Sequence, residues 1–220
     1  MKKIFLIMVV LLVSGAMMAQ GKLTTKSFLA FHGGPSFTVG DFGSRNQNND
    51  KAGFAKTGFN MNLNYGYQFA RNAGLTGTAF YSRYNLDKAA LESGTLPGVN
   101  ADHWQLQGLA AGPMLTHHLT PDVVADLRVM GGVAHANLPK GTFDGTVVTS
   151  GDWKWTFVFQ GGLDLRFNIS GNMFILTNVD YMWMQPEFKS DFSPLIGGGT
   201  TRFHQTISVV NLTGGIGFKF

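Results

Sequence analysis

Five charged residues lie well inside stretches that are mostly apolar or uncharged, and they are the first candidates for chemistry. They are Asp126, Arg128, Asp164, Arg166 and Asp180. Carboxylates and guanidinium groups on one face of neighbouring strands would either line a gated or ion-selective constriction or hold one another as a polar plug. Opposite charges at matching depth on adjacent strands favour the plug, because paired charges satisfy a closed interior.

The six histidines are the second set of candidates. His117 and His118 are adjacent, so in a strand they point to opposite faces and cannot share a metal ion. A lipid-cleaving acyl hydrolase needs a serine, a histidine and an acid, and Ser82 with His135 is the least unsuitable pair. The remaining histidines have no serine or carboxylate at a recognisable spacing, and the chain has no cysteine. We therefore expect no catalytic residue, no metal site and no cofactor.

The elements that position these side chains show a period of two. In Gly58–Phe69 every odd position is large and apolar or aromatic, and every even position is glycine or an uncharged amide. Trp153–Asn168 repeats the alternation. A helix would need apolar residues at i, i+3 and i+4, and those positions here mix both sets. The pattern is typical of a strand whose two faces meet different media.

This alternation, bounded by turn residues, predicts eight strands. They are Ser27–Val39, Gly58–Phe69, Leu75–Leu86, His103–His118, Val123–Leu138, Trp153–Ile169, Met173–Pro186 and Phe203–Phe220. In the first of them, Pro35 predicts a β-bulge. Between the strands, long loops at 40–57, 87–102, 139–152 and 187–202 alternate with short turns. Outer-membrane barrels have this arrangement, so we predict an all-β fold, an eight-stranded antiparallel up-and-down transmembrane β-barrel.

The competing architecture is a soluble lipocalin-type barrel with its apolar face inside. Eight strands leave an interior that side chains only just fill, and the aromatic residues of Gly58–Phe69 and Trp153–Asn168 would overfill it. The opposite face carries uncharged amides where a water-facing surface would carry Lys and Glu. We therefore expect the apolar face to meet lipid and the lumen to be polar. The aromatic girdles at the membrane interfaces are expected to include Trp153, Trp155, Tyr181 and Trp183.

The N-terminus has the features of a secretory signal. Lys2 and Lys3 precede the apolar run Ile4–Val13, and the Ala19–Gln20 bond offers a cleavage site. Ten residues cannot span ~30 Å of hydrocarbon as a helix, which needs about 20. We expect residues 1–19 to be a cleavable signal peptide and residues 20–220 to be one barrel domain. Cleavage leaves 15 basic against 13 acidic residues, a net charge of +2, so we expect no nucleic-acid partner.

The chain ends in I-G-F-K-F, with Phe218 and Phe220 on the apolar parity. This ending resembles the C-terminal signal that the outer-membrane assembly machinery recognises, which makes both residues candidates for an assembly signal. Together with G-G-P-S-F-T-V-G-D-F at 33–42 and the alternation of the strands, it makes the mature chain resemble the small outer-membrane β-barrels of Gram-negative bacteria. This is the porin-family group of OmpX-like and OmpA-barrel-like proteins. Its members include structural and adhesive proteins, narrow pores and a few lipid-modifying enzymes.

The resemblance implies residence in the cell outer membrane, with outer-membrane lipids, lipopolysaccharide and the assembly machinery as partners. Our first hypothesis is a structural or surface-interaction role, carried by four long external loops around a plugged lumen. Those loops would contact lipopolysaccharide, a matrix component or another envelope protein. The alternatives are a narrow passive pore and a lipid-modifying enzyme at the outer rim.

Overall fold

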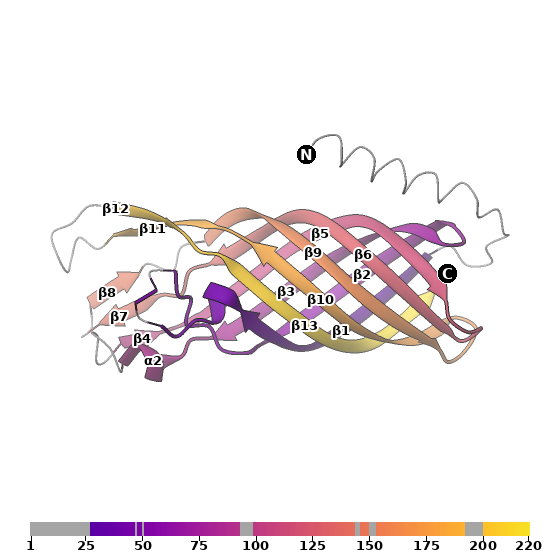
Figure 1. Cartoon of the computed structure of the whole chain (residues 1–220), viewed down its shortest axis with the longest axis horizontal. Coiled ribbons are helices and arrows are strands. Elements are labelled where there is room, and N and C mark those ends of the chain that lie inside the picture. The colour runs from indigo at the N-terminus through magenta and orange to yellow at the C-terminus, as the bar shows by residue number, and fades with distance from the viewer. Residues whose placement is uncertain are drawn as a thin grey trace.

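A computed structural model describes residues 27–46, 48–49, 51–92, 99–143, 146–149, 153–191 and 200–220. Eight strands close into one antiparallel barrel, in which each strand pairs with its sequence neighbours and the last pairs with the first (Figure 1). The strands are β1 (Ser27–Val39), β2 (Gly58–Ala70), β3 (Ala73–Asn85), β5 (His103–His118), β6 (Val123–Asn137), β9 (Trp153–Asn168), β10 (Met173–Met184) and β13 (Ile207–Lys219). The predicted up-and-down barrel is confirmed. The expected signal peptide, residues 1–19, lies outside the described residues.

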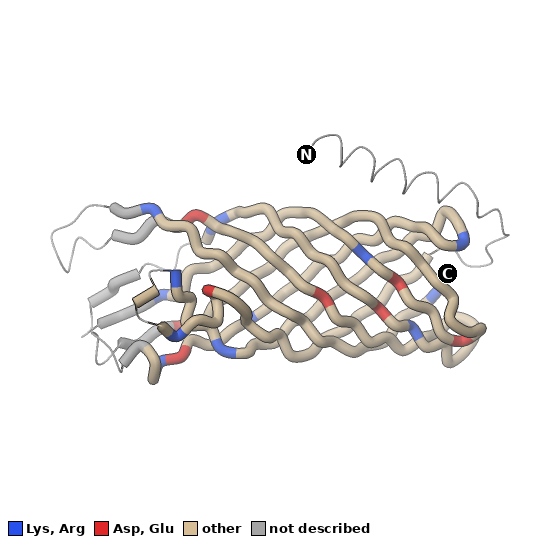
Figure 2. The backbone as a smooth tube through the Cα atoms, viewed as in Figure 1, with Lys and Arg blue, Asp and Glu red and all other residues tan. Residues whose placement is uncertain are grey.

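The wall of the barrel places its apolar face outside. In β2, Phe59 is 51% exposed whereas Asn60 is fully buried, and the alternation continues to Phe69 and Ala70. Figure 2 shows that charged residues are sparse along the wall of the barrel. A wall that presents such aromatic rings outward is stable only against hydrocarbon, so the lipocalin-type alternative is wrong. In the described part of the chain, no helix is both long and apolar enough to cross a bilayer.

The connections divide the barrel into a turn end, which carries the short turns, and a loop end, which carries the long connections. Several long connections contain structure that the sequence did not predict. They include η1 (Gly40–Gly43), α2 (Lys88–Glu92), a small sheet of β4 (Val99–Ala101), β7 (Gly141–Phe143) and β8 (Thr146–Thr149), and a hairpin of β11 (Glu187–Asp191) and β12 (Thr200–His204). The predicted strand from Phe203 is divided into β12 and β13 at Gln205 and Thr206.

The predicted β-bulge at Pro35 is wrong. The pairs Gly33–Gly214 and Ser36–Asn211 keep one register on either side of it, so no residue is inserted. Proline has no N–H to donate, and the ladder to β13 is interrupted at Gly34 and Pro35 without shifting. Pairing with β2 continues through both positions.

Candidate functional site in the barrel lumen

The lumen has three layers, which can be followed along the inward face of β10. At the loop end Met184 and Met182 are buried, in the middle lie Asp180 and Asn178, and at the turn end lie Leu176 and Phe174. Because alternate residues of a strand share a face, these six side chains point into the same interior. The lumen is therefore not polar throughout, because apolar side chains are buried at both ends of this strand. Polar side chains also reach the turn end on other strands, since Arg166 is opposite Leu176 and Thr116 is opposite Asp126.

The apolar layer at the turn end is built around two phenylalanine rings. Phe28 and Phe174 meet edge to face, with ring centroids 5.7 Å apart. Each ring lies over a glycine of a neighbouring strand, Gly66 below Phe28 and Gly217 below Phe174, where a Cβ would overlap ring atoms. Glycine at these two positions therefore makes the room that the rings fill. Ala30, Met114 and Leu176 complete this layer.

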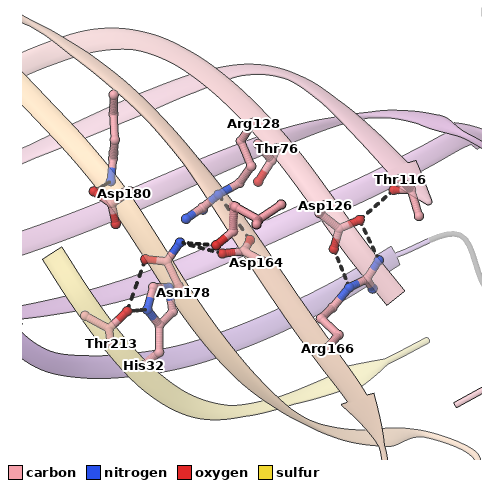
Figure 3. Close-up of polar contacts among 12 residues, drawn as sticks. His32, Thr76, Thr116, Asp126, Arg128, Asp164, Arg166, Asn178, Asp180 and Thr213 are labelled. Carbon is pink, nitrogen blue, oxygen red and sulfur yellow. Dashed lines mark hydrogen bonds and ion pairs between the residues drawn. The ribbon is translucent and has the colours of Figure 1, made fainter. Parts of the chain in front are cut away.

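Arg166 and Asp126 form a buried ion pair (Figure 3). The Arg166 guanidinium lies over both rings. Arg166 Nε lies 2.5 Å from Asp126 Oδ2, and Arg166 Nη2 donates to Asp126 Oδ1 at 2.9 Å. The guanidinium carbon lies 4.4 Å from the centroid of the Phe28 ring, a cation–π contact. Thr116 also donates to Asp126, at 2.6 Å. Two-point contact between a fork and a carboxylate is the strongest form of ion pair, and here both partners are buried.

A second ion pair joins Arg128 to Asp164 through Nε and Oδ2 at 3.1 Å. Asn178 donates to Asp164 at 2.6 Å, Thr213 donates to Asn178 at 3.2 Å, and the Nδ1 of His32 lies 2.7 Å from the Thr213 hydroxyl. Since that hydroxyl proton is used toward Asn178, His32 is the donor to Thr213. The series of donors ends on a carboxylate, so it stabilises the charged form of Asp164.

Asp180 is the third acidic residue of the layer and accepts hydrogen bonds instead of forming an ion pair. Gln160 and Asn211 each donate to its Oδ1 at 2.9 Å. Ser36 donates to Asn211, and Tyr84 lies 2.7 Å from Ser36. Within the described residues, Asp180 Oδ2 and both terminal nitrogens of Arg128 have no hydrogen-bond partner although they are buried. Arg128 is therefore less completely satisfied than Arg166.

The strand register decides which charges pair. Asp126 and Asp164 are directly opposite across β6 and β9, whereas Arg166 is opposite Val124 and Arg128 is opposite Gly162. Each arginine therefore reaches diagonally to the aspartate of the other strand. The alternation predicts that all five charged residues face the lumen, and the structure buries all five there. The identity of the partners depends on a register that alternation alone does not define.

The apolar layer at the loop end is closed by a residue from a connection. Phe42, in η1, is fully buried and meets Tyr84 and Trp104 with ring centroids 5.3 and 5.5 Å away. Phe188 packs on Trp104 from another connection, at 5.9 Å. Trp104 Nε1 donates to the carbonyl of Gly53 at 3.1 Å. The connection at 40–57, expected to be an external loop, thus folds inward and fills the mouth of the barrel.

Asp87 holds this inward-folded connection to the rim. Its carboxylate lies 2.9 Å from Arg45 Nε and 3.2 Å from Lys56 Nζ, and it accepts a hydrogen bond from the amide of Ala90 at 3.4 Å. Burial by itself raises the pKa of Asp87, but Lys56, the Ala90 amide and Arg45 together hold that pKa below its usual value. Both cations come from the connection, so the ion pairs hold the connection against the segment that directly follows β3.

Ser82 and His135 do not form a site. Ser82 is buried in the lumen and accepts a hydrogen bond from Asn60 at 2.8 Å. His135 lies on the outer face, stacked on Trp155 with ring centroids 4.5 Å apart and close to Trp153 at 4.7 Å. The two side chains are therefore on opposite faces of the wall. In the part of the chain that the structure describes, no three His, Asp or Glu residues are grouped to hold a metal ion.

The two candidate assembly-signal residues lie on the outer face at the turn end. Phe218 and Phe220 are both exposed, and the Phe220 ring lies 6.4 Å from that of Tyr65. The backbone of Phe220 exchanges hydrogen bonds with Ser27, which closes the barrel at its first and last strands. Both rings are thus accessible from the lipid side.

No family model and no curated protein matches this sequence. Among solved structures, the chain is similar to Ail, the attachment invasion locus protein of Yersinia pestis, with 18% identity over 90% of this chain and 100% of that chain, and a TM-score of 0.52. It is also similar to Neisserial surface protein A, with 13% identity over 88% and 97% of the two chains and a TM-score of 0.52. At these identities the likeness shows the fold. The chain has the fold of the small eight-stranded transmembrane barrels.

Proposed function

We propose that this protein is an outer-membrane barrel with a closed lumen and a structural or surface-interaction role carried by its four long connections. The observation that carries the proposal is the mouth of the lumen, where Phe42 packs between Tyr84 and Trp104. A polypeptide that fills its own entrance offers no path for a solute. The connections at the loop end are then the part of the molecule left to meet a partner.

Three further features support the outer-membrane placement. The apolar outer face needs lipid, the segment 1–19 has the composition of a cleavable signal peptide, and Phe218 and Phe220 are exposed at the end of the chain, where we propose that they act as an assembly signal. The two similar structures are an attachment invasion locus protein and a surface protein, which fits a role at the cell surface. Lipopolysaccharide or an envelope protein is the partner we infer for the connections.

A narrow passive pore is the second candidate, and the polar middle layer is the observation in its favour. That layer lies between the ring pair Phe28–Phe174 and the cluster around Phe42. Ions crossing the apolar cluster around Phe42 would lose hydration without gaining a partner, which is why we place the pore second. A lipid-modifying enzyme is third, since Ser82 and His135 lie on opposite faces of the wall.

The orientation of the barrel tests the surface role, and the natural absence of cysteine makes the test clean. Lys140 is exposed at the loop end, and Arg71 is exposed in the turn between β2 and β3. In intact cells, a membrane-impermeant maleimide should label Lys140→Cys and should label Arg71→Cys only after the outer membrane is opened. The protein should fractionate with the outer membrane and migrate differently on gels when heated.

Two results would contradict the proposal. Labelling of Arg71→Cys but not Lys140→Cys on intact cells would place the long connections in the periplasm and remove the surface role. Recovery in the soluble fraction, with no heat-dependent shift in migration, would remove the membrane placement.

A further inference from the structure

The outer wall of the barrel has an apolar groove of about 310 Å³ across β1, β2, β3 and β5. Its floor is formed where β3 presents Gly77 and Ala79, and its sides include Leu63, Tyr65 and Leu109. These residues are register neighbours, since Tyr65 pairs with Gly77 and Ala79 pairs with Leu109. Gly77, Ala79 and Ala111, the β5 partner of Gly77, are small, so they leave a hollow beside the larger Leu63, Tyr65 and Leu109.

A single cation, Arg83, lies on β3 toward the loop end, beside His103 of β5. Arg83 Nη2 lies 3.1 Å from His103 Nδ1, and Gln105 pairs with Arg83 across the strands. Arg83 has no carboxylate within ion-pair distance in the described part of the chain. His103 contacts Arg83 through Nδ1 and Gln105 through Nε2, so both of its ring nitrogens are in use. Arg83 therefore offers its guanidinium group on the outward side of the wall, held in place by His103.

The order of these residues along β3 matches the order of groups in a lipid. From the turn end, the outward positions of β3 include Leu75, Gly77, Ala79, Tyr81 and Arg83. Ala79 and Arg83 are four residues apart, which is about 13 Å along a strand. The groove thus lies at the depth of acyl chains, and Arg83 lies toward the headgroups, where Arg and Tyr are favoured at a bilayer surface.

We propose that this face binds one lipid with a phosphate headgroup, with the phosphate on Arg83 and an acyl chain in the groove. A guanidinium binds a phosphate through two parallel hydrogen bonds, which makes Arg83 the principal contact. A second copy of the chain is a poorer occupant, because a two-fold contact through this face would oppose one Arg83 to another. The proposal rests on the membrane placement proposed above and adds a specific ligand class to it.

Native mass spectrometry of the folded barrel in detergent tests this site. The protein is titrated with phosphatidic acid and, separately, with phosphatidylcholine that has the same acyl chains. The wild type should retain one phosphatidic acid in preference to phosphatidylcholine. Arg83→Gln should weaken phosphatidic acid binding about fivefold, as expected for one interfacial cation, with little change for phosphatidylcholine. Gly77→Leu should weaken both lipids, because it fills the groove.

Each variant has a matched control. Arg71→Gln removes an exposed cation at the turn end, and Gly214→Leu adds a leucine on β13, where a Cβ has only the Leu176 carbonyl oxygen near it, at 3.8 Å. Neither should change binding of either lipid. If Gly77→Leu does not fold, Ala79→Leu replaces it as the groove-filling variant.

The outcomes separate cleanly. Equal weakening by Arg83→Gln and Arg71→Gln would mean attraction by overall charge and would overturn the headgroup site. Unchanged binding in the groove-filling variant would overturn the acyl-chain site. A folded barrel without preference for phosphatidic acid contradicts this lipid site alone, whereas a chain that does not fold as a heat-modifiable barrel contradicts the proposed function.

Discussion

Replacing Arg166 by methionine should leave the buried charge of Asp126 without its partner. Methionine keeps an unbranched side chain over the Phe28 ring but removes both contacts to Asp126, at 2.5 and 2.9 Å. Asp126 is fully buried and would keep only its hydrogen bond from Thr116. Breaking a buried pair by removing one partner costs about 3–5 kcal/mol, because the remaining charge is uncompensated. We expect the free energy of unfolding to fall by that amount.

The double variant Arg166→Met, Asp126→Asn distinguishes the effect of an uncompensated buried charge from the effect of lost packing. It removes both charges and leaves asparagine able to accept the hydrogen bond from Thr116. Most of the lost stability should therefore return, because deleting both partners of a buried pair is often close to neutral. The control is Arg202→Met, whose partner Glu187 is 3.7 Å away, with the two side chains 68% and 44% exposed. An exposed pair of this kind contributes about 0–1 kcal/mol.

Urea unfolding of the barrel folded into lipid vesicles measures all three variants, with the slope of the transition checked for each. If Arg166→Met costs no more than Arg202→Met, then Asp126 is hydrated and the turn end of the lumen is open to water. That result would contradict a lumen whose turn end is filled by the two phenylalanine rings and the Arg166–Asp126 pair.

Three other predictions follow from the rim and the last strand. Phe42→Ala should lower the free energy of unfolding by about 3–5 kcal/mol, because it empties a buried aromatic site, and Phe157→Ala, on the lipid face, is the comparison in the same urea assay. The pKa of Asp87 is lowered on folding, so its contribution is present above its usual pKa of 3.8 and is lost as the pH falls through the lowered value. Proteolysis of the connection at 40–57 should therefore rise below about pH 4, and Asp87→Asn should make it high and independent of pH across that range. Phe220→Ala should lower the amount of assembled barrel in cells more than the stability of refolded protein, since burying one aromatic ring contributes only ~1.5–3 kcal/mol. Equal outer-membrane levels of mutant and wild type would exclude the assembly signal.

The barrel could be predicted from sequence because the residues of its strands follow one alternation of apolar and polar positions. Gly58–Phe69 was predicted to within one residue at its end, since all twelve positions obey the alternation. The orientation of Asp126 and Arg166 toward the lumen follows from the same parity. Their pairing does not, because it depends on a diagonal contact set by the register of β6 and β9.

The apolar layers were missed for a related reason. Met182 and Met184 share a face with Asp180. The alternation assigns large residues to the outer face, so it does not predict large residues on the inner face. A signal was available, since residues such as Tyr84 and Phe174 are aromatic at inward positions. The inward fold of Phe42 had no such signal, because a tertiary contact with Trp104 determines it and a polar connection predicts only exposure.

The closed lumen is tested most directly by the conductance of the purified wild-type barrel in a planar bilayer. Insertion is verified by the heat-dependent shift in migration of the same preparation. Paired charges that hold one another across the lumen, below an apolar cluster that fills its mouth, should give no steady, well-defined channels. Reproducible unitary channels from the folded wild-type protein would contradict a closed lumen and make this barrel a pore.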